Sequence, residues 1–131
     1  MIVYRPIHVD DYEAVRTFLV DNGWAARVKD AERFRAMLDG ADRTVVALDS
    51  GRVVGFARAL CDGASTGYIS TVAVAAELRR QGIGRRLVEH LMQGDSGEIT
   101  WVLRAARESR GFWERLGFIA SEVAMERVRQ K

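Results

Sequence analysis

The stretch from Tyr68 to Met92 constrains this fold more than any other part of the chain. An apolar, β-branched run, Tyr68–Val74, predicts a strand, and a short turn leads from it into a segment rich in glycine and arginine. A helix follows, because apolar residues recur at helical spacing: Ile83, Leu87, Val88, Leu91 and Met92. A strand that delivers a glycine-rich turn to a helix N-terminus forms an anion site. Backbone N–H groups point outward there, the helix dipole favours negative charge, and glycines let a phosphate approach the backbone.

The charges around this turn agree with an anion site. Four arginines, Arg79, Arg80, Arg85 and Arg86, surround the glycines, with only two acids close by in the sequence, Glu77 and Glu89. A solvated helix face is the alternative explanation for such a cluster. The net charge of the whole chain is only +2, which is too small to indicate binding to nucleic acid or to a membrane.

Length and composition predict a single domain over residues 1–131. Apolar residues make up 48% and charged residues 29%, which is ordinary for a globular protein, and no apolar run approaches the length of a membrane span. The N-terminus lacks the pattern of a secretory signal. The single cysteine, Cys61, allows neither an internal disulfide nor a cysteine metal cluster, so we expect a cytoplasmic protein without a metal site.

The remaining periodicities predict an alternation of strands and helices. The expected strands are Ile2–Arg5, Thr44–Leu48, Val53–Leu60, Glu98–Leu103 and one or two within Ile119–Arg127, besides the one at Tyr68. We expect one helix after Asp10 or Asp11, ending at Asn22-Gly23, a second capped by Asp30, and a last one over Glu108–Leu116. Asp49-Ser50-Gly51 indicates the turn of a hairpin. The fold class is therefore α/β (α+β): a mixed, mostly antiparallel sheet of six to seven strands, flanked by about four helices.

Three features in this order resemble the Gcn5-related N-acetyltransferases, and together they cover essentially the whole chain. Residues 79–84, Arg-Arg-Gln-Gly-Ile-Gly, fill the acetyl-CoA signature of that family, Q/R-x-x-G-x-G/A. The signature follows a strand ending in Val72-Ala73-Val74 at the usual spacing. Residues 111–118, Gly-Phe-Trp-Glu-Arg-Leu-Gly-Phe, are similar to the late helix of the family.

The resemblance implies acetyl-CoA as the acyl donor. The backbone N–H groups of Arg80, Gln81, Gly82, Ile83, Gly84 and Arg85 would then cradle its pyrophosphate, with Arg79 among the cationic partners. Pantetheine would pair with the strand edge at Val72, Ala73 and Val74, and a backbone N–H near Val72 or Ala73 would polarise the thioester carbonyl. The family strand splays from the next strand, here Glu98–Leu103, and the cofactor enters the gap.

The late helix departs from the family pattern in its acid. Many members protonate the leaving thiolate with a tyrosine where this chain has Trp113, and an indole N–H is not a usable acid. A CoA thiol is already a tolerable leaving group as thiolate. Tyr68 and Ser109 are the candidates for a catalytic proton donor. Ser109 is also the candidate for a cofactor hydrogen bond, because Ala105 and Ala106 occupy the neighbourhood of the usual asparagine.

A general base and an acceptor are harder to predict. Asp62, Glu98, Glu108, His8 and His90 are weak candidates for the base, and a solvated surface explains each equally well. Aromatic residues that could line an acceptor pocket are Tyr12, Trp24, Phe34, Trp101 and Trp113, although core packing is the commoner role for such residues. No acidic cluster indicates a polyamine acceptor, and we expect a small or exposed amine.

Two further possibilities stay open at this point. The replacement of tyrosine by Trp113 favours a non-catalytic acyl-CoA-binding module as the alternative function. A nucleotide-phosphate binder of another fold is disfavoured, because the glycine segment lacks a P-loop lysine. Family analogy alone makes a homodimer through the C-terminal strands plausible.

Overall fold

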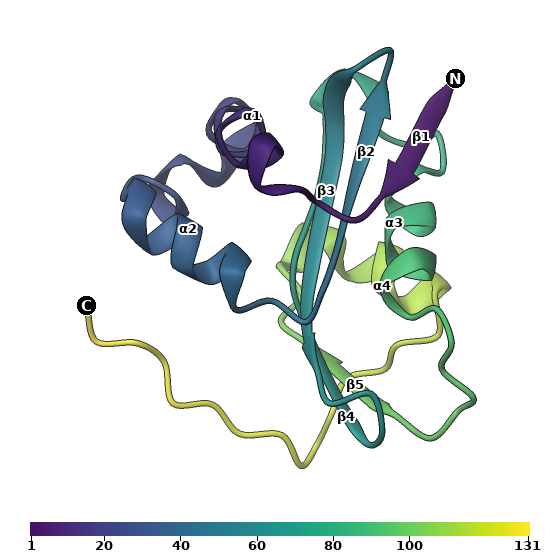
Figure 1. Cartoon of the computed structure of the whole chain (residues 1–131). Helices are drawn as coiled ribbons and strands as arrows, with labels where there is room; N and C mark the ends of the chain where they lie inside the picture. Colours follow the sequence, from purple (N-terminus) through teal and green to yellow (C-terminus); the bar gives the residue numbers. More distant parts are fainter.

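A five-stranded sheet with the order β1-β2-β3-β4-β5 organises the chain (Figure 1). The coordinates are a computed structural model that describes residues 1–131. The strands are β1 (Ile2–Arg5), β2 (Arg43–Asp49), β3 (Arg52–Cys61), β4 (Thr66–Val74) and β5 (Thr100–Leu103). Neighbouring strands from β1 to β4 are antiparallel, and β5 runs parallel to β4. The expected mixed, mostly antiparallel sheet is therefore confirmed.

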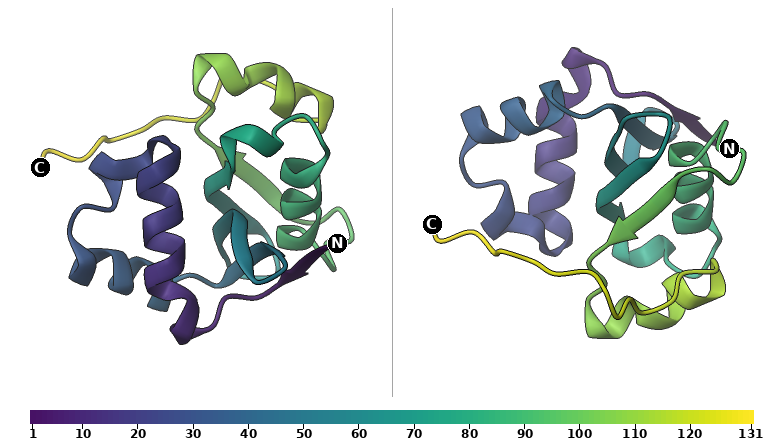
Figure 2. Two further views of the ribbon diagram at one scale, coloured as in Figure 1. Left: turned by 90° about the horizontal axis from the view of Figure 1, so that it is seen from above. Right: turned by 90° about the horizontal axis from the view of Figure 1, so that it is seen from below.

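Helices cover both faces of this sheet. They are α1 (Tyr12–Leu19), α2 (Ala31–Asp39), α3 (Ile83–Leu91) and α4 (Arg110–Arg115). Helices α1 and α2 lie on one face, and α3 and α4 lie on the other (Figures 1 and 2). The expected cap of α2 is present, because the Asp30 carboxylate accepts hydrogen bonds from the backbone N–H groups of Glu32 and Arg33.

The core follows from the apolar stripe of α3. Ile83, Leu87, Val88 and Leu91 are all buried. Gly55 of β3 lets the helix approach the sheet closely, since a Cβ there would lie 3.1 Å from Leu87 Cδ1. Gly55 therefore marks the α3 face of β3, which fixes the orientation of the neighbouring strand residues.

The predicted hairpin between β2 and β3 is also confirmed. Asp49 pairs with Arg52, so the turn has two residues, Ser50 and Gly51, whose φ angles are 51° and 84°. Positive φ at both positions is the geometry of a type I′ turn, which matches the twist of the strands it joins.

The predicted count of six to seven strands is wrong, because residues 119–131 form no strand. Alternation of apolar residues suggested strands over Ile119–Arg127, but Ile119, Val123 and Met125 are 90%, 90% and 96% exposed. The Ser121 hydroxyl accepts hydrogen bonds from the N–H groups of Val123 and Ala124, which bends the chain within the expected strand. The first residues of the tail pass near β5 without pairing with it, and the rest runs away from the sheet as extended chain, so β5 is an edge strand (Figure 1).

Candidate functional site

Strands β4 and β5 separate half-way along β4. Their parallel register runs from Thr66 opposite Thr100 to Ile69 opposite Leu103, and there β5 ends. Residues 70–74 of β4 continue without a neighbour on that side. A strand edge without a partner leaves backbone N–H and C=O groups free for an extended ligand. The expected separation of these two strands is thus present in the backbone.

A β-bulge marks the point of separation. Arg58 of β3 pairs with Thr71, whereas the next residue, Ala59, pairs with Ile69, so Ser70 is the extra residue in β4. A bulge bends its strand and leaves one residue unpaired in the ladder. In this chain the bend falls directly after the last residue that β4 shares with β5.

The turn between β4 and α3 gathers unbonded N–H groups. Backbone N–H groups of residues 80–85 donate no hydrogen bond within the protein, and the first one that does is that of Arg86, to the Gly82 carbonyl. Arg80 and Gly82 have φ angles of 67° and 84°. Such left-handed residues turn successive N–H groups toward one side, which forms a concave anion site. No acidic residue occupies the first turn of α3, so the helix dipole there is uncompensated.

The four arginines of this region divide into two pairs. Arg85 and Arg86 lie near Glu89, at 3.7 Å and 3.9 Å, and Arg86 also stacks over the Tyr4 ring. Arg79 instead folds back onto the end of β4, where its Nε donates to the Val74 carbonyl at 3.4 Å. Arg80 is exposed and has no ion pair. Arg79 and Arg80 therefore lie, in the sequence, at the junction between the free edge of β4 and the unbonded amides of residues 80–85.

The two signature glycines have different structural reasons. Gly82 needs its positive φ, and a Cβ there would meet nothing within 4 Å. A Cβ on Gly84 would lie 3.1 Å from Cε1 of Phe112 in α4 and 3.6 Å from Cγ2 of Val74. The sequence suggested that side chains at both positions would push phosphates away. At Gly84 a side chain would also meet the Phe112 ring, so this glycine lets α3 pack against α4.

The candidate proton donors lie on different sides of the sheet. Tyr68 is partly buried and pairs with Leu60 of β3, just before the bulge. Ser109 directly precedes α4, and its hydroxyl donates to the Ala106 carbonyl at 2.9 Å. Trp113 is buried and makes edge-to-face contacts with Phe112 and Phe118, at centroid distances of 4.9 Å and 5.3 Å. Trp113 is therefore part of the packing between α4 and the segment after it.

The structure adds no support for the weak candidates for a general base. The Asp62 carboxylate accepts from the N–H groups of Ala64, Ser65 and Thr66, and these bonds hold its pKa far below the ordinary value. Asp62 is thus a turn residue. Glu98 and Glu108 are exposed, and His90 stacks on Tyr4 at a centroid distance of 5.3 Å.

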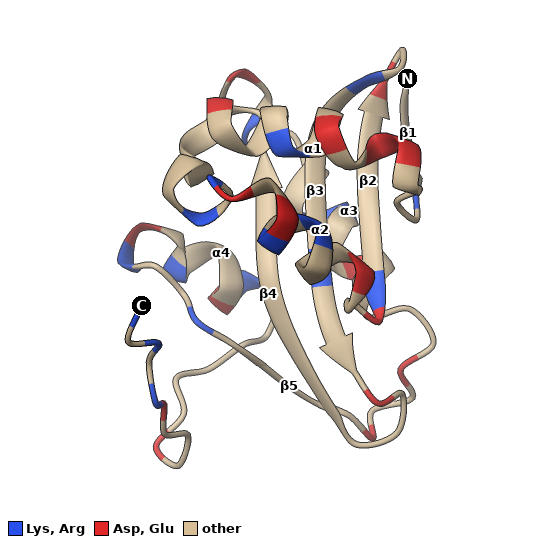
Figure 3. Ribbon diagram, turned by 60° about the vertical axis from the view of Figure 1, so that its left-hand side comes forward, with Lys and Arg blue, Asp and Glu red and all other residues tan.

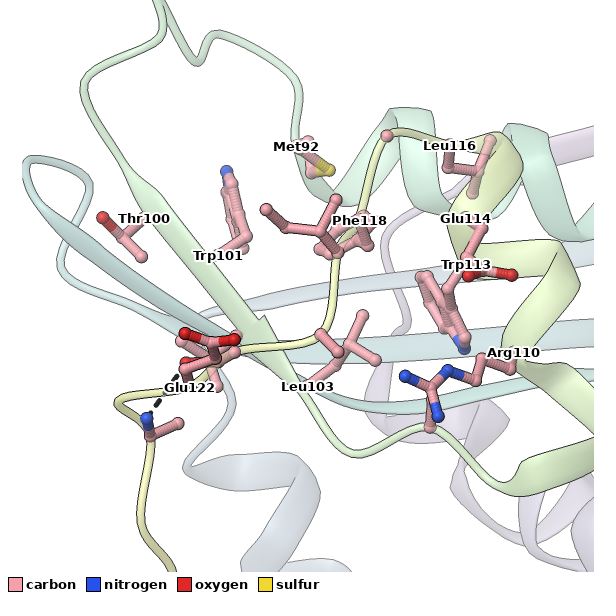
Figure 4. A pocket seen from close by; sticks show the side chains of 17 residues that line it. Met92, Thr100, Trp101, Leu103, Arg110, Trp113, Glu114, Leu116, Phe118 and Glu122 are labelled. Atoms are coloured by element: carbon pink, nitrogen blue, oxygen red, sulfur yellow. Dashed lines mark hydrogen bonds between the residues drawn. The ribbon is translucent and has the colours of Figure 1, made fainter.

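The aromatic candidates for an acceptor pocket do not meet in one place. Phe34 is buried in the core beneath α2, and the Tyr12 hydroxyl donates to Asp39. Trp101 and Trp113 line a different space of about 930 Å³, between β5, α4 and the tail. Figure 4 shows Trp101 and Leu103 entering this space from β5, with Phe118 beside them. It lies along the outer edge of β5, where further strands were expected.

The sequence did not indicate a role for the Arg58 guanidinium, which lies beside the bulge on the face of the sheet that α1 and α2 cover. Arg58 donates from Nη2 to Ser70 Oγ at 3.1 Å and from Nη1 to the Met37 carbonyl of α2 at 3.5 Å. Burial lowers the pKa of Arg58, an effect that Tyr68 partly opposes. Arg58 escaped notice because it stands within an apolar strand, and only the register shows what lies beside it.

The rest of the surface is mixed in charge. Lys and Arg positions are interspersed with Asp and Glu positions along the helices and loops of the ribbon, and the strands have few of either (Figure 3). No helix combines the length and the apolar character that crossing a membrane requires. No three His, Cys, Asp or Glu side chains are grouped as metal ligands.

Comparisons with known proteins agree with this geometry. A family model described as an acetyltransferase (GNAT) domain matches residues 40–120. A probable acetyltransferase from meticillin-resistant Staphylococcus aureus has a similar structure, with a TM-score of 0.83 and 21% identity over 100% of this chain and 99% of that one. A putative GNAT acetyltransferase from Xanthomonas campestris has a TM-score of 0.80 and 24% identity, over 98% of this chain and 94% of that one.

An aminoglycoside N-acetyltransferase in complex with CoA gives a TM-score of 0.76 and 15% identity, over 100% of this chain and 96% of that one. At these identities the structures share the fold. A search of curated proteins finds no match.

Proposed function

Because this chain belongs to the GNAT acetyltransferase family, we propose that it transfers the acetyl group of acetyl-CoA to a primary amine by direct attack in a ternary complex. The unbonded amides at residues 80–85 and the free edge of β4 carry the proposal. They are adjacent in the chain, as a pyrophosphate and a pantetheine arm are adjacent in coenzyme A.

The donor groups present suit each part of acetyl-CoA. The pyrophosphate would bind the N–H groups of Arg80, Gln81, Gly82, Ile83, Gly84 and Arg85, with the guanidinium groups of Arg79 and Arg80 as cationic partners. The amides of pantetheine match the spacing of a strand, so that arm would pair with β4 along Val72, Ala73 and Val74. The Ser109 hydroxyl donates its hydrogen to the Ala106 carbonyl, so toward the cofactor it would act as a hydrogen-bond acceptor.

Acetyl-CoA supplies an acyl group already activated as a thioester. An N–H of Val72 or Ala73 would hold the thioester carbonyl and stabilise the oxyanion that develops on its oxygen. The amine nitrogen attacks the carbonyl carbon, a C–N bond forms, and the C–S bond breaks with its electron pair on sulfur. The amine proton passes to solvent or to the thiolate, and Tyr68, two residues before the bulge residue in β4, is the candidate proton donor.

Two measurements test this function. Saturating acetyl-CoA should raise the melting temperature, since a ligand that binds only the folded state at about 100 times its Kd stabilises it by about 2.7 kcal/mol. Thiol release should then appear with at least one amine of a broad panel. An unchanged melting temperature in a folded protein would refute the cofactor assignment.

A non-catalytic acyl-CoA-binding module is the second candidate. The observation in its favour is Trp113, which is buried where many family members place an acid. Stabilisation by acetyl-CoA without thiol release on any amine would support the binding module over the enzyme.

We further infer a homodimer that pairs through the β5 edge and the tail. The outer edge of β5 has no partner strand, and the tail that follows α4 carries the exposed side chains of Ile119, Val123 and Met125. Apolar side chains this exposed on an extended segment suit burial against a second copy. Light scattering after size exclusion should give twice the mass of the chain, and Val123→Asp with Met125→Asp should return it to the single mass. A wild-type chain of single mass at high concentration would overturn the inference.

A further inference from the structure

Arg58 carries a charge that nothing in the protein neutralises. It stands on β3 and is partly buried, and no carboxylate of the chain lies within ion-pair distance of it. Its Nε is fully buried and has no hydrogen-bond acceptor. Taking an unpaired cation out of water costs free energy, and buried arginine is normally paired with a carboxylate or phosphate. A bound anion would neutralise this charge and could accept a hydrogen bond from Nε.

The strand register places this guanidinium on the face covered by α1 and α2. Gly55 faces α3, and side chains alternate along a strand, so Arg58 faces the other way. Its hydrogen bond to the Met37 carbonyl of α2 agrees with that orientation. Residues opposite each other in an antiparallel pair share a face, which adds Thr71, opposite Arg58, and Tyr68, opposite Leu60.

The same group lies beside the proposed site of acyl transfer. Arg58 Nη2 is 3.1 Å from the Ser70 hydroxyl, and Ser70 is the bulge residue where β4 leaves β5. The thioester carbonyl would be held two or three residues further along, at Val72 or Ala73. A ligand that reaches the thioester from this face passes the Arg58, Ser70 and Tyr68 side chains.

We propose that Arg58 binds an anionic group of the acceptor, so that the substrate is a compact primary amine bearing a carboxylate or phosphate a few bonds from its nitrogen. This assignment rests on the proposed acetyl transfer and names its substrate class. A guanidinium presents N–H donors in a planar fork that matches either anion, and the Ser70 hydroxyl adds one more donor. The short distance from Arg58 to the bulge excludes acceptors whose anion lies far from the amine.

Matched amine pairs test the assignment by steady-state thiol release. The pairs are glycine with glycinamide, β-alanine with β-alaninamide, and O-phosphoethanolamine with ethanolamine, so the arms separate carboxylate from phosphate. For at least one pair the anionic member should have the higher kcat/KM, by about tenfold to a hundredfold, as expected for a hydrogen-bonded charge. An amide neighbour makes an amine less basic, so higher reactivity of the carboxylate form is not explained by a larger fraction of free amine.

Variants of Arg58 provide the readout that a structural role would not give. Arg58→Met should raise KM for the anionic member alone and erase its advantage, and Arg58→Lys should keep part of that advantage. Arg33→Met, at an exposed arginine of α2, is the matched control and should change nothing. Removing an unpaired buried cation should leave the melting temperature equal or higher. Equal kcat/KM within every pair, or an advantage that survives Arg58→Met, would overturn the proposal.

A titration separates this proposal from the function it builds on. N-acetylglycine and N-acetylglycinamide are titrated calorimetrically into the wild-type chain and Arg58→Met, each in the presence of CoA. Tighter binding of the carboxylate to wild type alone supports the anion site even if no amine turns over, and then only the catalytic proposal fails. Should thiol release show no charge preference and the titration none either, the anion site is refuted while acetyl transfer stands.

Discussion

Replacing Gly67 by alanine should damage the junction between β4 and β5. A Cβ on this buried glycine would lie 2.4 Å from both Cε3 and Cζ3 of Trp101, which is directly opposite it in the parallel register. Unbonded carbon atoms rest about 3.5–4.0 Å apart, so the indole would have to retreat by more than about 1 Å. Its Nε1 donates to Asp95 at 2.8 Å, and the Arg43 guanidinium lies 5.5 Å from its centroid, so that movement breaks other contacts.

We expect Gly67→Ala to lower the free energy of unfolding by about 2–3 kcal/mol, in the upper part of the range for overpacked sites. For a chain of this length that corresponds to a fall in melting temperature of roughly 6–15 °C. Urea unfolding followed by circular dichroism measures the first quantity and a thermal scan the second.

Two companion variants make the test specific. Gly111→Ala places a methyl on the exposed side of α4, 3.4 Å from Arg115 Nη1, and should stabilise by about 0.5–1 kcal/mol through helix propensity. In a Trp101→Leu background the Gly67→Ala substitution should cost far less, because the ring is gone. A Gly67→Ala protein within about 0.5 kcal/mol of wild type, or an undiminished cost beside Leu at position 101, would refute the steric reasoning.

Three other predictions concern the anion site, the late helix and acid stability. Gly82→Asp should lower the melting temperature by a few degrees, because a residue with a Cβ is strained at a φ of 84°, and in the protein that remains folded it should abolish stabilisation by acetyl-CoA, since its carboxylate would face the pyrophosphate. Trp113→Phe should lower the free energy of unfolding by about 1–2 kcal/mol and leave thiol release within about threefold, because the indole packs and donates no proton. The Arg5 side chain bonded to Asp11 lowers the pKa of that carboxyl, so its stabilisation is present at neutral pH and is lost as the pH falls through the lowered value. Asp11→Asn should therefore cost about 1–2 kcal/mol in urea unfolding near pH 7 and much less near pH 2.

Local sequence patterns predicted most of the fold because they arise from local physics. The turn at Ser50-Gly51, the Asp30 cap and the α3 stripe each follow from neighbouring residues, and the structure contains all three. The prediction of strands in the tail was wrong for the same reason. Alternation at Val123 and Met125 is a local signal for a strand, but it does not tell whether the segment pairs with the free edge of β5, and the bend at Ser121 interrupts it.

The same distinction between local signals and long-range contacts applies to the candidate site. The sequence located the glycine turn, whose positive φ at Gly82 and unbonded amides are local properties. It did not indicate the contact of Gly84 with Phe112, because that contact depends on how α4 docks. Arg58 could not be found at all, since its neighbours, Ser70 and Met37, are distant in sequence and meet it only through the bulged register and the placement of α2.

Hydrogen exchange with and without acetyl-CoA tests the central claim most directly. The amides of residues 80–85 donate no hydrogen bond within the protein, and residues 70–74 have no neighbouring strand on the β5 side, so the amides of both segments that face outward should exchange quickly in the free chain. With saturating acetyl-CoA, peptides covering both segments should exchange more slowly, while peptides of β1 and the tail stay unchanged. Unaltered exchange at residues 80–85 in the presence of bound acetyl-CoA would contradict the assignment of this turn as the pyrophosphate site.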